Sequence, residues 1–200
     1  MSLIYQNSVP YSIRNSFLEK VVQICTRLEI NPNWLMAIMY FESAKTFSPT
    51  IRNPHTGAIG LIQFMPNTAK NLGTSIEALS KMTALQQLDF VERYLRPYKG
   101  RINNYTDTYF AVFFPLAIGK SDDWVLSAKN LSESLIARQN PVFDVNRDQK
   151  IQVHEVRQVM LRKLPSEWLK NTAFTIVRNT ALGIIPVLII GALVTFLVLK

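Results

Sequence analysis

Glu42 is the one acidic residue in the apolar stretch NPNWLMAIMYFES, residues 31–43. Leu35, Ile38 and Met39 form an apolar stripe if this stretch is helical, and Glu42 takes the next position on the stripe. An apolar surround disfavours the charged form of a carboxyl, so this placement could keep Glu42 protonated for general acid catalysis. The alternatives are a surface acid at a helix end and a buried structural acid paired with Arg or Lys.

A glycine-containing loop follows this stretch. The segment HTGAIGLIQFMP, residues 55–66, contains Gly57 and Gly60, which let a backbone turn tightly or approach a ligand because glycine has no Cβ. Gln63 offers both a hydrogen-bond donor and an acceptor. Such a loop is weak evidence alone, but together with an acid at the end of the preceding helix it indicates a candidate site.

Residues 144–155, DVNRDQKIQVHE, are similar to the calcium loop of an EF-hand. The predicted ligands are Asp144, Asn146, Asp148, the backbone carbonyl of Lys150, and Glu155. Gln149 stands where the motif has glycine and would have to hold a strained backbone. The loop also stands alone, whereas EF-hands usually pair. We expect weak, structural binding of Ca²⁺, and the alternative is an Asp-rich turn that caps a helix starting near Val153.

The acid and the loop together resemble the lytic transglycosylases of the soluble, goose-lysozyme-like type. The family pattern is Glu-Ser, a loop, and then Gly-Ala-x-Gly-Leu-Met-Gln-x-x-Pro-x-Thr-Ala. This chain has Glu42 and Ser43, then the block from Gly57 to Ala69, in which only Ile62 departs from the pattern. The resemblance extends over about residues 15–140, and its specific motifs lie within residues 42–69.

The resemblance implies cleavage of the β-1,4 bond between MurNAc and GlcNAc in peptidoglycan, with Glu42 as general acid and then base. In this family the substrate's N-acetyl group stabilises the cationic centre, and the sugar's own 6-hydroxyl closes a 1,6-anhydro ring. No cofactor is therefore expected for catalysis. The substrate-binding residues implied by the resemblance are Ser43, Gly60, Gln63 and Tyr109. Many members carry Ala-Tyr-Asn-x-Gly where this chain has YFAVFFPLAIG, so Tyr109 is matched to the family tyrosine by its hydroxyl alone.

The remaining periodicity is helical, with no alternating strand and no internal repeat. Helices are expected over residues 11–28, from Asn31 with Pro32 in the first turn, and over residues 66–73, 76–82, 85–95 and 131–138. A loop is expected through KGRINNYTD, residues 99–107. Residues 108–119 predict a buried core helix broken near Pro115. The fold is therefore expected to be mainly α and lysozyme-like, and Cys25 is expected to be a buried apolar side chain.

Residues 179–199 carry no charge, and at about 1.5 Å per residue they reach about 30 Å, which predicts a single-pass transmembrane helix. The expected organisation is a lysozyme-like domain over residues 1–140, an EF-hand-like loop and helix over 141–165, a basic juxtamembrane segment over 166–178, and the span over 179–199.

The expected partners are peptidoglycan glycan strands and a lipid membrane. The net charge of +8 favours an anionic partner, but no basic run interleaved with aromatic residues supports nucleic acid, and no pattern indicates an oligomeric state.

The distribution of charge raises a question of topology. Five cationic residues precede the predicted span, namely Arg157, Arg162, Lys163, Lys170 and Arg178, and only Lys200 follows it. The positive-inside rule then places the domain in the cytoplasm, whereas peptidoglycan lies outside, and residues 1–30 lack the pattern of a secretory signal. We favour a protein of a bacteriophage virion membrane; the alternative is a bacterial inner membrane with the N-terminus outside.

Two other functions fit the same residues. A lysozyme on this fold would use water and leave a reducing end, so its product would differ from the anhydro sugar by one water. A wall-binding or structural virion protein would keep the fold without activity. Substitution of Glu42 separates the inactive protein from both enzymes.

Overall fold

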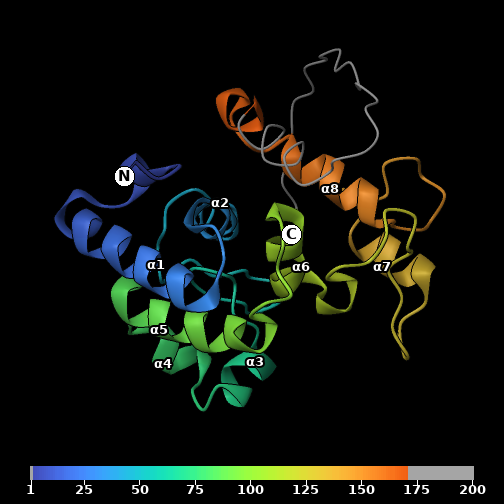
Figure 1. Ribbon diagram of the computed structural model, residues 1–200. Helices are drawn as coiled ribbons and strands as arrows, with labels where there is room; N and C mark the ends of the chain where they lie inside the picture. Colours follow the sequence, from blue (N-terminus) through green and yellow to red (C-terminus); the bar gives the residue numbers. More distant parts are fainter. Residues whose placement is uncertain (1, 171–200) are drawn as a thin grey trace.

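The computed structural model describes residues 2–170, and the regular elements within them are helical (Figure 1). The α-helices are α1 (Arg14–Leu28), α2 (Pro32–Glu42), α3 (Pro66–Asn71), α4 (Ile76–Ser80), α5 (Ala84–Leu95), α6 (Tyr105–Phe113), α7 (Glu133–Gln139) and α8 (Val153–Leu161). Short 3-10 helices are η1 (Gln6–Ser8), η2 (Tyr11–Ile13), η3 (Arg96–Tyr98) and η4 (Pro115–Ala117). Extended backbone pairs only at isolated bridges within the described residues. The expectation of a mainly α fold is confirmed.

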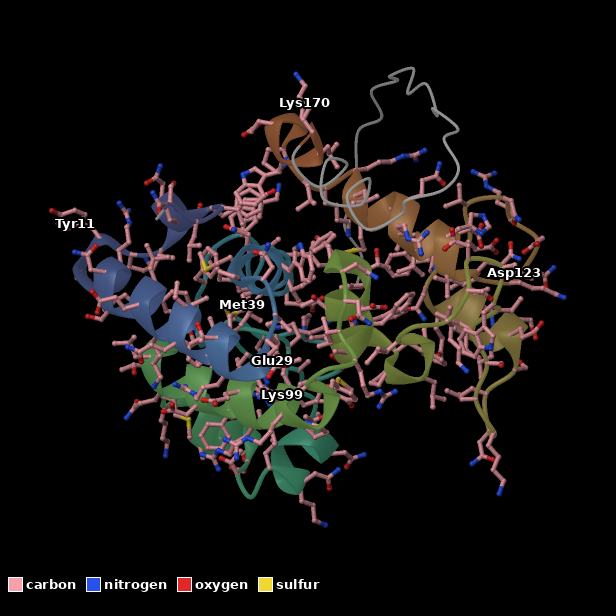
Figure 2. The ribbon with its side chains drawn as sticks, viewed as in Figure 1. Tyr11, Glu29, Met39, Lys99, Asp123 and Lys170 are labelled. Atoms are coloured by element: carbon pink, nitrogen blue, oxygen red, sulfur yellow. The ribbon has the colours of Figure 1, made fainter. Side chains whose placement is uncertain are left out.

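Helix α2 begins as its sequence predicts. The Asn31 side chain accepts a hydrogen bond from the Asn33 N–H at 2.9 Å, and Pro32 occupies the first turn, where its missing N–H leaves no bond unmade. The predicted stripe is buried because α1 and α6 both pack against α2. Met39 of that stripe lies in the interior of the molecule (Figure 2).

Helices α1 and α5 pack along each other and form the side of the core away from α7 and α8 (Figure 1). Arg27 pairs with Glu92 at 2.7 Å, and Lys99 pairs with Glu29 where the two helices end (Figure 2). Cys25 is buried on the apolar face of α1, as expected. Helix α1 also packs against α2 and so joins α5 to it.

Helix α6 starts earlier than the sequence indicates. The prediction of a loop through residue 107 is wrong for residues 105–107, because the Asn104 side chain accepts a hydrogen bond from the Asp107 N–H at 2.8 Å and caps the helix there. The helix ends before Pro115, as predicted, and η4 then folds back along it. The Gly119 N–H donates to the Asp107 carboxylate at 3.1 Å, which holds the returning chain against the start of α6.

The segment before α8 packs onto α6 through an aromatic side chain. Phe143, just before the predicted calcium loop, is buried against Tyr109 and Phe113 of α6, with ring centres 5.8 and 5.0 Å away. Helices α7 and α8 therefore lie on the other side of α6 from α1 and α5 (Figure 1). Helix α6 is shared by both halves of the described structure.

The predicted transmembrane helix, residues 179–199, lies outside the described residues, as does most of the juxtamembrane segment. Among residues 2–170, no helix combines the length and the apolar character that crossing a bilayer requires.

Candidate active site

Glu42 is the last residue of α2, and its side chain is buried, with 8% of its surface exposed. Three tyrosines from α5 and α6 feel its charge. Burial is the main cause of a raised pKa at Tyr94, Tyr105 and Tyr109, and the charge of Glu42 adds to the pKa of each. The Tyr94 hydroxyl donates to the Ala111 carbonyl at 2.9 Å.

Tyr109 is the tyrosine for which substrate contact is predicted, and it is fully buried. Its ring lies edge-on to Phe41, the residue before Glu42, with the ring centres 6.2 Å apart. Its hydroxyl has no hydrogen-bond partner among the described residues. Because an unpaired buried hydroxyl is costly, such a group is a good candidate for a hydrogen bond to a bound ligand.

The Ser43 side chain forms hydrogen bonds with the backbone at the end of α2 and just after it. Its hydroxyl donates to the Met39 carbonyl at 2.6 Å and accepts from the Phe47 N–H at 2.8 Å, and the side chain is fully buried. This geometry ends α2 and sets the turn after Glu42. Direct contact between Ser43 and substrate stays a prediction.

The glycine-containing loop folds on itself. Gly57 and Gly60 have φ angles of +72° and +79°, which glycine adopts without strain. Gln63 is half-buried, and its amide nitrogen donates to the Ile51 and Gly60 carbonyls at 3.3 Å each. Gln63 thus links two backbone segments of the loop through these hydrogen bonds. Its contact with substrate stays a prediction.

Gln87 of α5 is the residue that sequence reasoning missed. Its carbonyl oxygen accepts from the Leu61 N–H at 3.1 Å, and its amide nitrogen donates to the carbonyls of Pro49 at 2.7 Å and Leu79 at 2.9 Å. A Cβ at Gly60 would collide with this amide. Gln87 lies on the buried face of α5. The sequence could have indicated it in the same way as Glu42, because both are polar residues on the apolar stripe of a helix.

The segment after α8 reaches the end of α2. The Lys163 ammonium lies 3.3 Å from the centre of the Phe41 ring, and the Tyr5 hydroxyl donates to the Lys163 carbonyl at 3.0 Å. Tyr5 in turn stacks on Tyr40, with 3.8 Å between ring centres. Residues from both ends of the described chain therefore cover the helix end that carries Glu42.

The predicted calcium loop has part of the geometry of an EF-hand. Gln149 has a φ angle of +66°, the strained conformation expected for a residue in the glycine position. One oxygen of Asp144 accepts from the Gln149 N–H at 3.1 Å, and its other oxygen is buried without a partner among the described residues. Ile151 accepts a hydrogen bond from the Leu126 N–H at 2.8 Å, so the loop pairs with residues 124–126 rather than with a second EF-hand loop.

The acid at the end of this loop faces the backbone. Glu155 is buried, and its two oxygens accept from the N–H groups of Val145, Asn146 and Gln152 at 2.8–3.2 Å. Asn146 and Asp148 hydrogen-bond to each other. Across residues 2–170, no three His, Cys, Asp or Glu side chains converge in a way that could hold a metal ion. Binding of Ca²⁺ would therefore require Glu155 to give up backbone hydrogen bonds.

Residues 21–113 match the family model of the Transglycosylase SLT domain. The match begins within α1 and ends at the last residue of α6, so it includes Glu42, Gln63 and Tyr109. No curated protein and no solved structure matches the chain significantly. The region that carries Glu42 is thus similar to the transglycosylase SLT domain, whose members are lytic transglycosylases, glycosidic-bond lyases that act on peptidoglycan.

Proposed function

We propose that this protein is a membrane-anchored peptidoglycan lytic transglycosylase that cleaves the β-1,4 bond between MurNAc and GlcNAc. The observation that carries the proposal is the buried carboxyl of Glu42 at the end of α2, among tyrosines of α5 and α6, within the region that matches the SLT domain. Glu42 is the proposed catalytic residue.

The proposed reaction has two proton transfers through Glu42. A glycosidic oxygen is a poor leaving group until it is protonated, so the Glu42 carboxyl donates its proton as the bond to the anomeric carbon breaks. The substrate's N-acetyl oxygen stabilises the cationic carbon. The Glu42 carboxylate then takes the proton of the sugar's 6-hydroxyl, whose oxygen bonds to the anomeric carbon and closes the anhydro ring. Glu42 ends the cycle protonated, and no water is consumed.

The surrounding residues have supporting roles in this proposal. The Tyr109 hydroxyl donates a hydrogen bond into the site, and the loop with Gly60 and Gln63 forms the facing wall. Ser43 maintains the turn that directs Glu42. Phe143 packs against Tyr109 from the α8 side. This aromatic contact covers the start of residues 109–119, where the sequence departs from the family pattern.

Clearance of purified cell walls by wild type and Glu42→Gln tests the proposal. We expect the variant to lose at least about 100-fold in rate, since general acid–base catalysis contributes about that much. Glu19→Gln, at an exposed glutamate of α1, is the matched control and should retain full activity. Equal clearance by Glu42→Gln and wild type would leave the inactive wall-binding protein as the better explanation.

Mass spectrometry of the released fragments separates the two enzymes. A transglycosylase releases anhydro products, which are lighter by one water than the reducing ends that a lysozyme releases. Reducing ends alone would assign the protein as a lysozyme with the same catalytic acid.

The proposed membrane anchor is residues 179–199, on the basis of their length without charge. Replacing Leu188 and Leu193 with arginine should release the protein from washed membranes, because each charge near the middle of a span costs about 3 kcal/mol. A wild-type protein found in the soluble fraction would contradict the anchor.

We place the protein in the membrane of a bacteriophage virion, with the bacterial inner membrane as the alternative. Its presence in purified virions would support the first location. Its presence only in cells, with the N-terminal part open to external protease in spheroplasts, would support the second.

We further propose that residues 144–155 bind Ca²⁺ weakly, in a structural role. The specific observation is the buried, unpartnered oxygen of Asp144 in a loop whose Gln149 already has the required positive φ. Side-chain oxygens of Asp144, Asn146, Asp148 and Glu155 and the Lys150 carbonyl would hold the ion. The affinity is weak because Glu155 must leave its backbone donors.

Calorimetric titration with CaCl₂ tests this site. We expect a dissociation constant of about 10⁻⁴ M or weaker, as in weak EF-hand-type modules. Asp144→Asn should abolish the heat signal, whereas Asp89→Asn on α5 should not change it. The absence of a heat signal in wild type at millimolar CaCl₂ would refute binding.

A further inference from the structure

A pocket whose lining does not include Glu42 lies where the chain folds back after α6. Its volume is about 470 Å³, within the range of small-ligand sites. Its lining includes Tyr98, Arg101, Leu116, Ile118, Lys120 and Trp124. The first two come from the end of η3 and the turn after it, and the others from η4 and the segment that follows. The pocket is thus lined by aromatic rings, apolar side chains and two cations.

The two cations remain available to an anionic ligand. Arg101 and Lys120 are exposed and lie 5.9 and 5.6 Å from the ring centres of Tyr98 and Trp124. Among the described residues, neither forms an ion pair with a carboxylate. The pocket therefore presents uncompensated positive charge beside aromatic rings.

The acids near the pocket have other partners. Asp122 pairs with Arg157, and the Asp107 carboxylate accepts hydrogen bonds from Gly119 and Asn104. Asp123 lies on the same segment, and a hydrogen bond from Ser121 lowers the pKa of its carboxyl. Figure 2 shows Asp123 at the edge of the molecule on the α7 side. The local balance of unpaired charge still favours an anion at Arg101 and Lys120.

A row of aromatic side chains connects this pocket to the candidate active site. The Tyr98 ring centre lies 6.2 Å from that of Tyr94, which lies 6.5 Å from that of Phe64 in the glycine-containing loop. Burial is the main cause of the raised pKa of Tyr94, followed by Tyr98 and then by the charge of Glu42. Tyr94 thus contacts a ring of the pocket and also feels the charge of Glu42.

We infer that this pocket binds a carboxylate-bearing part of the peptidoglycan strand, next to the bond that Glu42 cleaves. Aromatic rings pack against sugar rings, while Arg and Lys bind carboxylates through charge-assisted hydrogen bonds. The lactyl carboxyl of a muramoyl sugar forms an amide bond with the attached peptide, so in an intact strand the carboxylate belongs to that peptide. The inference rests on the proposed function, because it assigns one part of the same peptidoglycan substrate to this pocket.

Binding to purified sacculi in the Glu42→Gln background tests the pocket without cleavage. The test variant adds R101Q and K120Q, and the matched control instead adds K81Q and R138Q, which remove the same charges from exposed positions outside the pocket. We expect the pocket variant to bind about 5-fold more weakly than the control, as for the loss of two exposed ion pairs. The difference should shrink at 1 M salt, where the Debye length falls to about 3 Å.

Two substrate preparations identify the carboxylate. Sacculi with amidated carboxylates lose the peptide charges, and an amidase removes the peptides and frees the lactyl carboxylates in their place. A difference that is present on untreated sacculi and lost on amidated ones assigns the peptide, and a difference that persists on peptide-stripped strands shows that a free lactyl carboxylate is bound as well. Both results support the inference.

Equal binding by the pocket variant and the control on untreated sacculi would overturn the inference and leave the proposed function untouched. Failure of the proposed function would be seen separately, as equal wall clearance by wild type and Glu42→Gln. Thermal midpoints of both double variants should match that of the parent, because all four replaced side chains are exposed.

Discussion

At the scale of single residues, the proposed function gives the central chemistry to Glu42 and Tyr109. Both are buried, both are polar, and they come from helices that pack against each other. The Tyr109 hydroxyl has no hydrogen-bond partner among the described residues, and burial of such a group costs free energy. This burial supports the proposed role of Tyr109 as a donor to the substrate.

Tyr109→Phe removes one oxygen and keeps the packing against Phe41, Phe113 and Phe143. We expect wall clearance to fall by about 10-fold to 100-fold, as for the loss of one donor to a reacting group. The thermal midpoint should stay the same or rise, because the hydroxyl has no partner among the described residues. Tyr11→Phe, at an exposed tyrosine, is the control. Unchanged clearance by Tyr109→Phe would assign Tyr109 to the core alone.

At the scale of elements, the glycine-containing loop is held by α5 as well as by its own hydrogen bonds. Gln87 bonds to Leu61 within the loop, to Pro49 before it and to Leu79 after it. Gly60 leaves the space that the Gln87 amide occupies. The loop and α5 therefore behave as one unit.

Gly60→Ala and Gly73→Ala separate two costs of a side chain at a glycine with positive φ. One is the backbone strain of that φ, and the other is the collision of the new Cβ with a neighbour. Both glycines have φ near +75°, but a Cβ at Gly73 meets open space, whereas one at Gly60 meets Gln87. Gly73→Ala should cost about 1–2 kcal/mol of unfolding free energy, the backbone term alone. Gly60→Ala should cost at least about 2 kcal/mol more, measured by urea unfolding, because the buried Gln87 bonds must also shift. Equal costs would show that the loop does not depend on Gln87.

At the scale of the whole molecule, many of the titratable groups in the core are neutral. Burial raises the pKa of Cys25 from 9.0 to about 12, and burial, then Tyr40 and Glu167, raise the pKa of Tyr5 from 10.0 to about 12. The unfolded chain would release these protons about two to three pH units earlier than the folded chain. The resulting stability is fully present below about pH 9 and is lost as the pH rises toward 12.

The urea midpoint should therefore be level near pH 8 and fall steadily between about pH 9 and about pH 11. Cys25→Ala removes one of these groups, so its midpoint should be lower at pH 8 but should fall less steeply over that range. A wild-type midpoint that stays level to pH 11 would contradict the burial of these groups.

The sequence by itself determined much of the local structure and the burial of Glu42. The Asn31 cap, the break at Pro115 and the buried position of Glu42 follow from capping chemistry, proline geometry and helical period, which act within a few residues. Such features need no knowledge of the partner segments.

Only the tertiary structure decided which distant residues meet. The clamp of Gln87 on residues 49–61, the contact of Phe143 with Tyr109, and the pocket between Tyr98 and Trp124 each join residues at least 26 positions apart. No local pattern encodes these pairings, because they arise when apolar faces of separate helices pack and bring polar groups into reach. For the same physical reason, Glu42 could be proposed as the acid from the sequence, but the residues around it could be found only in the fold.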